Sequence, residues 1–231
     1  MNLVSAAQSW QMSDAVRERV LRRQGQLPAH QSIDARRTAL VVVDMQNYFC
    51  APGFPAEVAA SRATVPAINR MAAALRGAGG CVAWVQTTAR GATDRWARHH
   101  RHMLSPARVQ SRLAGLAEDA EGFRLFDGLE AHDGDLYVTK ITYSAFIAGS
   151  SDLHDRLAAR GIESLLIAGT ATNVCCESTA RDAMMLDYRV VMLSDANSAF
   201  TLAEHVNSLD NFALFFGDVI SVDDAIGRLA R

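Results

Sequence analysis

The stretch Gly169-Thr-Ala-Thr-Asn-Val-Cys-Cys-Glu-Ser-Thr-Ala-Arg-Asp-Ala183 follows the apolar run Leu165-Leu-Ile-Ala168. This order predicts a buried strand that gives way to a helix, with Cys175 at the junction. Backbone N–H groups at a helix N-terminus are unpaired and lie at the positive end of the peptide dipoles, so they favour a thiolate and later an oxyanion. Cys175 is therefore a candidate nucleophile. The alternative is that Cys175 and Cys176 are small apolar filler, because free cysteine is among the most often buried residues.

Two further apolar runs end in charged residues. Ala39-Leu-Val-Val-Val-Asp44 ends in an acid, and Asp135-Leu-Tyr-Val-Thr-Lys140 ends in a lysine. Because the carboxyl ends of strands in an open parallel sheet line one crevice, we expect Asp44, Lys140 and Cys175 to converge there. A lysine lowers the pKa of a thiol, and an acid can accept the thiol proton and pass it to a leaving group. Taken singly, the acid also fits a helix or turn cap, and the lysine a solvated charge at a strand end.

Strand and helix patterns alternate along the rest of the chain. The expected order is a helix over 65–75, a strand over 81–86, a helix over 151–160, a strand over 165–168, a helix over 175–186, a strand over 190–193, a helix over 202–216, a strand over 219–220 and a helix over 222–229. Alternation of this kind favours an α/β fold with three α/β/α layers, in which a doubly wound, mainly parallel sheet is covered on both faces. Residues 89–134 lack a clear period and are expected to form a partly helical excursion over the pocket.

The length of 231 residues and the hydrophobic content of 49% suit one domain with a large core. We predict a polar N-terminal extension over residues 1–36 and a single domain over residues 37–231. Within the extension, Ser13 is expected to cap a short helix that Pro28 ends.

Charge and hydropathy limit the kinds of partner that the chain is expected to have. The formal net charge is −2, from 23 basic and 25 acidic residues, which gives no sign of a surface for nucleic acid or anionic membranes. No stretch approaches the roughly 18 apolar residues that span a bilayer, and the N-terminus lacks a signal-peptide core. We therefore expect no nucleic-acid partner, no membrane partner and a cytoplasmic location.

Neither disulfides nor a metal site are predicted. The chain has four cysteines without the spacing of a disulfide framework, which are Cys50, Cys81, Cys175 and Cys176. Neighbouring cysteines do not readily meet disulfide geometry, so reduced thiols are expected. The cluster His99, His100 and His102 lies among arginines that would repel a metal ion, so a helix at the surface or pocket rim is the simpler interpretation.

The chain resembles the isochorismatase-like cysteine hydrolases over roughly residues 37–220. The motifs that carry the resemblance are Val-Val-Val-Asp44-Met-Gln, Lys140 with Tyr143-Ser-Ala-Phe146, Gly-Thr-Ala-Thr-Asn-Val-Cys175, and Arg181-Asp-Ala with Asp187-Tyr, in the family's order. The Ala-Thr-Asn-Val-Cys turn is most similar to that of the branch containing ureidoacrylate amidohydrolases and N-carbamoylsarcosine amidases. Nicotinamidases of this family hold a metal through an acid and two histidines, but Gln86-Thr-Thr-Ala-Arg-Gly-Ala-Thr offers no such set.

The resemblance implies a Rossmann-type hydrolase domain over residues 37–231 with a catalytic triad of Asp44, Lys140 and Cys175. It also implies a cis peptide bond at Thr170–Ala171 and an oxyanion hole formed by the backbone N–H groups of Ala171 and Cys175. The implied substrate-binding residues are Gln46, Phe49, Trp84, Gln86, Tyr143, Phe146, Thr170 and Asn173. Aromatic residues in such places also fit a core role.

The implied activity is that of a cysteine amidohydrolase. It would cleave the C–N bond of a small carbamoyl, ureido or carboxamide compound through a thioester and release ammonia, without a cofactor, as a dimer or tetramer. Thr87 stands where ureidoacrylate hydrolases tend to carry Asn, and Arg90 and Arg95 are candidates to bind a substrate carboxylate, or are merely solvated. The alternatives are an isochorismatase that cleaves a vinyl ether, which typically lacks the nucleophilic cysteine, and a non-catalytic thiol or partner-binding protein.

Overall fold

The computed structural model describes residues 8–230, and a six-stranded parallel sheet forms its centre. The strand order is β4-β3-β2-β5-β6-β7. The bounds are β2 (Thr38–Val43), β3 (Cys81–Thr87), β4 (Leu136–Lys140), β5 (Ser164–Thr170), β6 (Arg189–Ser198) and β7 (Asp218–Ile220). The chain runs outward from β2 to β4, then returns and runs outward again from β5 to β7, so the topology reverses between β2 and β5. This is the doubly wound order of a Rossmann-type sheet.

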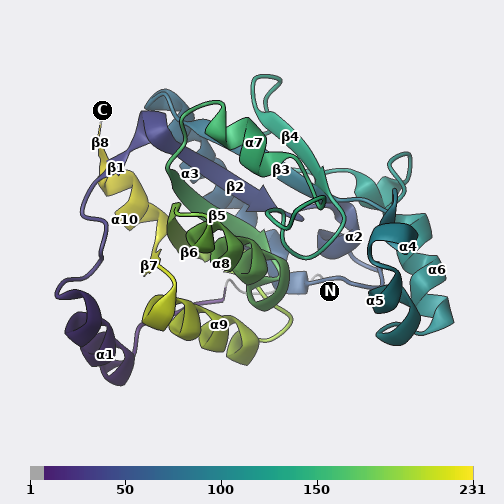
Figure 1. Cartoon of the computed structure of the whole chain (residues 1–231), viewed down its shortest axis with the longest axis horizontal. Helices are drawn as coiled ribbons and strands as arrows, with labels where there is room; N and C mark the ends of the chain where they lie inside the picture. Colours follow the sequence, from purple (N-terminus) through teal and green to yellow (C-terminus); the bar gives the residue numbers. More distant parts are fainter. Residues whose placement is uncertain (1–7, 231) are drawn as a thin grey trace.

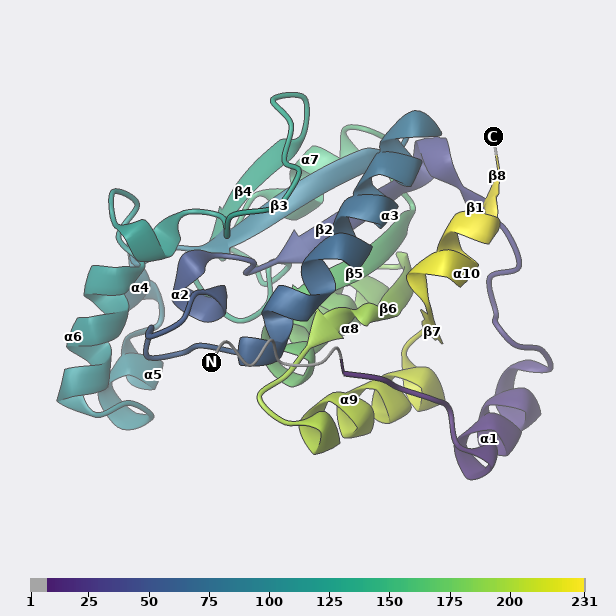
Figure 2. The same cartoon turned by 180° about the vertical axis from the view of Figure 1, so that it is seen from behind.

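Helices cover both faces of the sheet. On one face lie α3 (Val65–Gly77) and α10 (Val222–Gly227), which Figure 2 shows in front of the strands. On the other face lie α7 (Leu153–Ala158), α8 (Glu177–Met185) and α9 (Leu202–Phe215) (Figure 1). The predicted three-layer α/β/α fold is confirmed.

The helices on both faces of the sheet explain why the strand sequences are apolar throughout. All six residues of β2 are buried, and successive side chains point to opposite faces. Val41 and Val43 pack in the cluster that contains Leu157 of α7, whereas Leu40 and Val42 pack in the cluster that contains Met71 of α3. Neither face of the strand meets water, so no polar alternation is needed.

The N-terminal segment lies against the later part of the chain. The expected short helix is present as α1 (Asp14–Gln24), with the Ser13 hydroxyl accepting from Val16, but Gly25 ends it in a left-handed conformation before Pro28. Ahead of α1, the Trp10 indole donates to Asp210 of α9 over 2.8 Å. The division into an extension and a domain stays a prediction.

The C-terminal helix is shorter than expected. It ends at Gly227, and β8 (Leu229–Ala230) then pairs in parallel with β1 (Ile33–Asp34). The sequence pattern missed this pairing because two-residue strands carry no measurable period.

Residues 89–134 form the expected partly helical excursion. It contains α4 (Ala92–Arg95), α5 (Ala97–His102), α6 (Pro106–Gly115) and a short 3-10 helix (Glu121–Phe123), and two further such helices span Ala35–Arg37 and Ala59–Thr64. Figure 1 shows the excursion beyond the carboxyl ends of β2 and β3, next to α2 (Asn47–Cys50). Among residues 8–230, no helix has the length and apolarity needed to cross a bilayer.

Candidate active site

The three predicted catalytic residues meet where the sheet topology reverses. Asp44 directly follows β2, Lys140 ends β4, and Cys175 follows β5, the strand next to β2. Gly169 in β5 has φ of 121°, and a Cβ there would lie 2.0 Å from the Val43 carbonyl oxygen. Only glycine therefore lets β2 and β5 come this close at the crevice where open α/β sheets bind ligands.

Asp44 and Lys140 form a fully buried ion pair. The Lys140 Nζ donates to Asp44 Oδ2 over 2.8 Å, and neither side chain is exposed. The other two Nζ bonds go to Thr87 Oγ1 at 2.7 Å and to the Thr142 carbonyl oxygen at 3.1 Å. Burial opposes the charge on Lys140, but the Asp44 carboxylate and the nearby Cys175 outweigh it and raise the pKa of Lys140. The ammonium stays charged and holds the carboxylate in place.

Thr87 completes this network from the end of β3. Its backbone N–H and hydroxyl donate to Asp44 Oδ1 at 3.1 and 2.8 Å. Thr87 and Lys140 together therefore give the Asp44 carboxylate three hydrogen bonds, two on Oδ1 and one on Oδ2. In the sequence, Thr87 stands out only as a departure from a family pattern. Its position as the last residue of β3 is the signal that could have found it, because it shares the sheet edge with Asp44 and Lys140.

Cys175 lies on a wide helical turn (Thr172–Cys176) that leads into α8, and it is 7% exposed. Burial raises the pKa of the Cys175 thiol to about 12, and the Asp44 carboxylate adds to the rise more than Lys140 offsets it. Lys140 lowers the pKa of the thiol as expected, but burial and Asp44 outweigh its effect. The sulfur carries its proton beside a carboxylate that acts on it as a hydrogen-bond acceptor.

The two adjacent cysteines differ in environment. Cys176 is fully buried, and its sulfur lies 4.0 Å from the Ala168 carbonyl oxygen of β5. Burial raises the pKa of the Cys176 thiol well above its usual value. It packs as an apolar side chain in the cluster between the sheet and α8.

The cis peptide bond implied by the resemblance is present between Thr170 and Ala171. Within the described chain, no backbone hydrogen bond joins the N–H of Ala171 or of Cys175 to another element. Both groups flank the turn that carries the thiol.

Two of the predicted substrate-binding residues are buried and bonded to other parts of the protein. Trp84 is fully buried in the core beneath α3, where its indole donates to Asp135 at the opposite end of β4 over 2.8 Å. Gln46 uses its amide nitrogen for the carbonyls of Thr87 and Phe123, and its amide oxygen accepts from the Thr87 N–H. With every hydrogen of the amide bonded and no exposure, Gln46 ties the excursion to the sheet edge instead.

The other predicted substrate-binding residues differ in their exposure to solvent. Tyr143 is 36% exposed and lies close enough to Cys175 for the thiol to raise its pKa, after burial as the larger cause. Asn173 has a buried Oδ1 that no described residue contacts through a hydrogen bond. Four further residues are buried and stay predictions as substrate contacts, namely Phe49, Gln86, Phe146 and Thr170.

The arginines proposed for a substrate carboxylate are already engaged. Arg90 forms an ion pair with Glu118, and Arg95 donates to the Ala148 carbonyl oxygen. His99 stacks on Trp96 with ring centroids 3.8 Å apart. Among residues 8–230, no group of three or more His, Cys, Asp or Glu side chains has an arrangement that could hold a metal ion.

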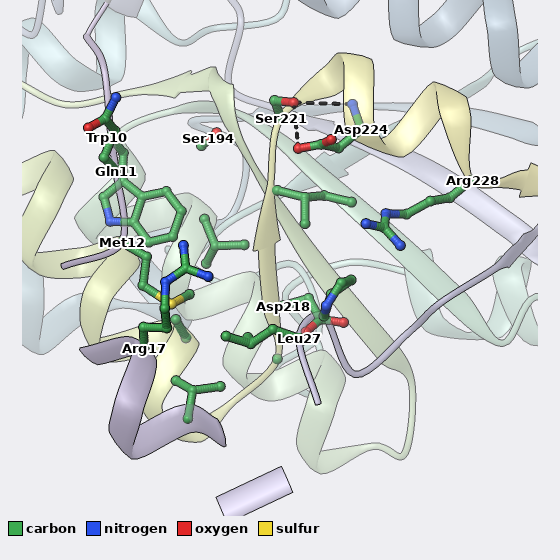
Figure 3. Close-up of a pocket in the computed structure, with 16 residues that line it drawn as sticks. Trp10, Gln11, Met12, Arg17, Leu27, Ser194, Asp218, Ser221, Asp224 and Arg228 are labelled. Atoms are coloured by element: carbon green, nitrogen blue, oxygen red, sulfur yellow. Dashed lines mark hydrogen bonds between the residues drawn. The ribbon is translucent and has the colours of Figure 1, made fainter. Parts of the chain in front are cut away.

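One hollow of the surface lies away from the three predicted catalytic residues. It is a cavity of about 430 Å³ between the N-terminal segment and β7. Figure 3 shows Trp10 and Arg17 on one side of this cavity and Arg228 on the other. No member of the Asp44, Lys140 and Cys175 set lines it.

Comparison with known proteins agrees with this geometry. The isochorismatase domain family matches residues 38–224, which include all three clustered residues. The chain belongs to the isochorismatase family. It is an enzyme that hydrolyses non-peptide C–N bonds. A set of Asp, Lys and Cys is typical of this family.

Relatives and solved structures show which members of the family the chain is similar to. The ureidoacrylate amidohydrolase RutB of Variovorax paradoxus (strain S110) is 36% identical over 221 residues, covering 88% of this chain and 85% of that protein. RutB of Pseudomonas syringae pv. syringae (strain B728a) is 38% identical over 206 residues, covering 81% of each chain. A cysteine hydrolase from Pseudomonas syringae pv. phaseolicola 1448A has a TM-score of 0.75 at 30% identity, covering 85% of this chain and 94% of that one.

Proposed function

We propose that this isochorismatase-family member is a cysteine amidohydrolase that cleaves the C–N bond of a small carbamoyl, ureido or carboxamide compound and releases ammonia. The observation that carries the proposal is the buried Asp44–Lys140 ion pair beside the thiol of Cys175. Support for the substrate class comes from the Ala-Thr-Asn-Val-Cys turn and from relatives that are ureidoacrylate amidohydrolases.

The first step is attack of the Cys175 sulfur on the substrate carbonyl carbon. Because the resting thiol is protonated, its proton moves to the Asp44 carboxylate as the S–C bond forms. Lys140 remains an ammonium and fixes the carboxylate beside the sulfur. A neutral resting thiol also keeps the site from carrying a second buried anion next to Asp44.

The developing oxyanion takes hydrogen bonds from the backbone N–H groups of Ala171 and Cys175. Both donors are free of bonds to other elements, which supports this role. Removing one such donor typically costs roughly 3 to 4 kcal/mol of transition-state stabilisation.

The tetrahedral intermediate collapses when its C–N bond breaks. Asp44 returns the proton to the departing nitrogen, so ammonia leaves and a thioester on Cys175 remains. Asp44 then takes a proton from a water molecule that attacks the thioester, and that proton restores the thiol. Where the product is a carbamate, it loses carbon dioxide after release.

Substrate contacts come from the turn and the excursion. The unpartnered Oδ1 of Asn173 is suited to accept from a substrate N–H, and the half-open Tyr143 borders the thiol. Phe49, Gln86, Phe146 and Thr170 complete the proposed set.

Ammonia release across a panel of ureido acids, carbamoyl amino acids and primary carboxamides tests the activity. We expect turnover of at least one ureido or carbamoyl compound, poor turnover of nicotinamide, and no cleavage of isochorismate. Pyruvate release from isochorismate, with no ammonia from any amide, would overturn the proposal.

We also expect turnover to be independent of metal ions. The acid and two histidines that hold the nicotinamidase metal have no counterpart in the Gln86-Thr-Thr-Ala-Arg-Gly-Ala-Thr segment. Dialysis against EDTA should leave kcat unchanged. A loss of activity that added zinc, iron or manganese restores would contradict this expectation.

A further inference from the structure

Arg112 of α6 lies in the excursion that faces the triad. Its guanidinium carbon is 6.0 Å from the centroid of the Trp96 ring. Trp96 in turn packs edge-on against Tyr143, with ring centroids 4.7 Å apart. The guanidinium therefore borders an aromatic wall that leads to Tyr143, three residues after Lys140.

The positive charge of Arg112 reaches the reacting groups. It opposes the rise that burial imposes on the pKa of Cys175, and it likewise opposes the rise in the pKa of Tyr143. It also acts against the raised pKa of Lys140. The same charge opposes the rise that burial imposes on the pKa of Tyr48 in α2 and adds to the fall that burial imposes on the pKa of His99 in α5, so it acts on the excursion as well as on the reacting groups.

Arg112 is half-buried, yet it makes no ion pair and no side-chain hydrogen bond with any residue of the described chain. Other arginines of similar burial are paired, for example Arg62 with Glu57 and Arg181 with Glu177. The contact with the Trp96 ring offers no oxygen acceptor, and removing the five guanidinium donors partly from water without one is unfavourable. The arrangement is that of a cation whose partner is a ligand.

The helix that carries Arg112 is fixed at this end. A Cβ on Gly115 would lie 2.5 Å from the Tyr48 ring, so α6 lies directly against α2. Leu116 is fully buried, and its carbonyl accepts from the Ala89 N–H just beyond β3. Arg112 is thus held one turn from an anchored point, which limits the ordering that ligand binding requires.

We propose that Arg112 is a specificity-determining residue that binds a carboxylate on the substrate while the C–N bond faces Cys175. The proposal rests on the proposed function and names its substrate class as small monoanionic acids that carry a ureido, carbamoyl or carboxamide group. A planar guanidinium matches a carboxylate through two parallel hydrogen bonds. The charges of Asp44 and Lys140 cancel, and the Cys175 thiol is neutral. The positive charge of Arg112 is therefore matched by a substrate with a single negative charge.

Alkylation of Cys175 by iodoacetate and by iodoacetamide tests this assignment without turnover. Iodoacetate carries a carboxylate where iodoacetamide carries a carboxamide, and both alkylate the same sulfur. Any change in the pKa or the exposure of the thiol affects both rates alike, so their ratio isolates recognition of the carboxylate. Rates are followed on the full chain by mass spectrometry of the Cys175 peptide.

We expect Arg112→Gln to lower the iodoacetate-to-iodoacetamide rate ratio at least tenfold and Arg112→Lys to lower it less. The matched control is Arg108→Gln, which removes an equal charge one turn earlier on α6, where Arg108 is exposed. This control should keep the ratio within about twofold. An unchanged ratio in a folded Arg112→Gln protein, or an equal fall in the Arg108 control, would overturn the assignment.

A second measurement needs no variant. In the unchanged protein, propionate should protect Cys175 from iodoacetamide at concentrations at least tenfold lower than propionamide does. Equal protection by both compounds would contradict a carboxylate site. If no amide is turned over but both measurements give the expected results, the proposed function fails and the role of Arg112 stands.

Discussion

Replacing Cys175 with alanine is expected to lower kcat by at least about 10⁴-fold, because no other group at the site can form the thioester. The fold should survive, since the change removes one sulfur atom from a turn at the rim of the core. Initial rates of ammonia release, together with a thermal melt, measure the two quantities on the same preparation.

The matched control is Cys176→Ala at the neighbouring residue. Its sulfur is fully buried and faces β5, so its loss leaves a small cavity that costs about 1 kcal/mol of unfolding free energy. Most of the activity should remain. An inactive Cys176→Ala protein beside a Cys175→Ala protein that still turns over substrate would show that the nucleophile is assigned to the wrong cysteine.

Replacing Asp44 with asparagine is expected to lower kcat about 10⁴-fold and also to destabilise the fold. Asparagine keeps the shape but does not accept the thiol proton. It also leaves the ammonium of Lys140 buried without a counter-charge, and breaking a buried pair in this way costs roughly 3 to 5 kcal/mol. Denaturant unfolding gives the stability, and single-turnover assays give the rate.

The double variant Asp44→Asn with Lys140→Met separates the two effects. Removing the unpaired ammonium should recover much of the lost stability, because two neutral side chains then share the site. Activity should stay as low as in Asp44→Asn. A single variant that keeps more than a tenth of the activity would exclude Asp44 as the proton acceptor, and a double variant no more stable than the single one would show that the ion pair is not the source of the loss.

The raised pKa of Cys175 gives the ion pair a specific part in catalysis. The Asp44 carboxylate, which is paired with Lys140, makes a second anion beside it unfavourable, so the thiolate forms only as the carbonyl carbon accepts the sulfur. Lys140 acts mainly through Asp44, and Arg112 is a second cation that packs on Trp96 and forms no ion pair with any described residue.

The sequence by itself determined the architecture and the three central residues. Strands with no polar alternation require helices on both faces, and the carboxyl ends of such strands share one edge. Asp44, Lys140 and Cys175 could therefore be brought together from strand ends alone, and the Ala-Thr-Asn-Val-Cys turn indicated the family. The same rule, applied to the end of β3, would also have found Thr87.

Only the tertiary structure decided the rest of the site. Trp84 and Gln46 stand in motifs that resemble a substrate pocket, but they donate hydrogen bonds to Asp135 and Phe123, which are distant in sequence. Arg112 lies in a segment without a clear period, so no pattern places its helix over the crevice. The balance of burial and charge that keeps the Cys175 thiol protonated likewise depends on distances between four separate segments, and a sequence pattern specifies which face or edge a residue occupies but not which groups surround it there.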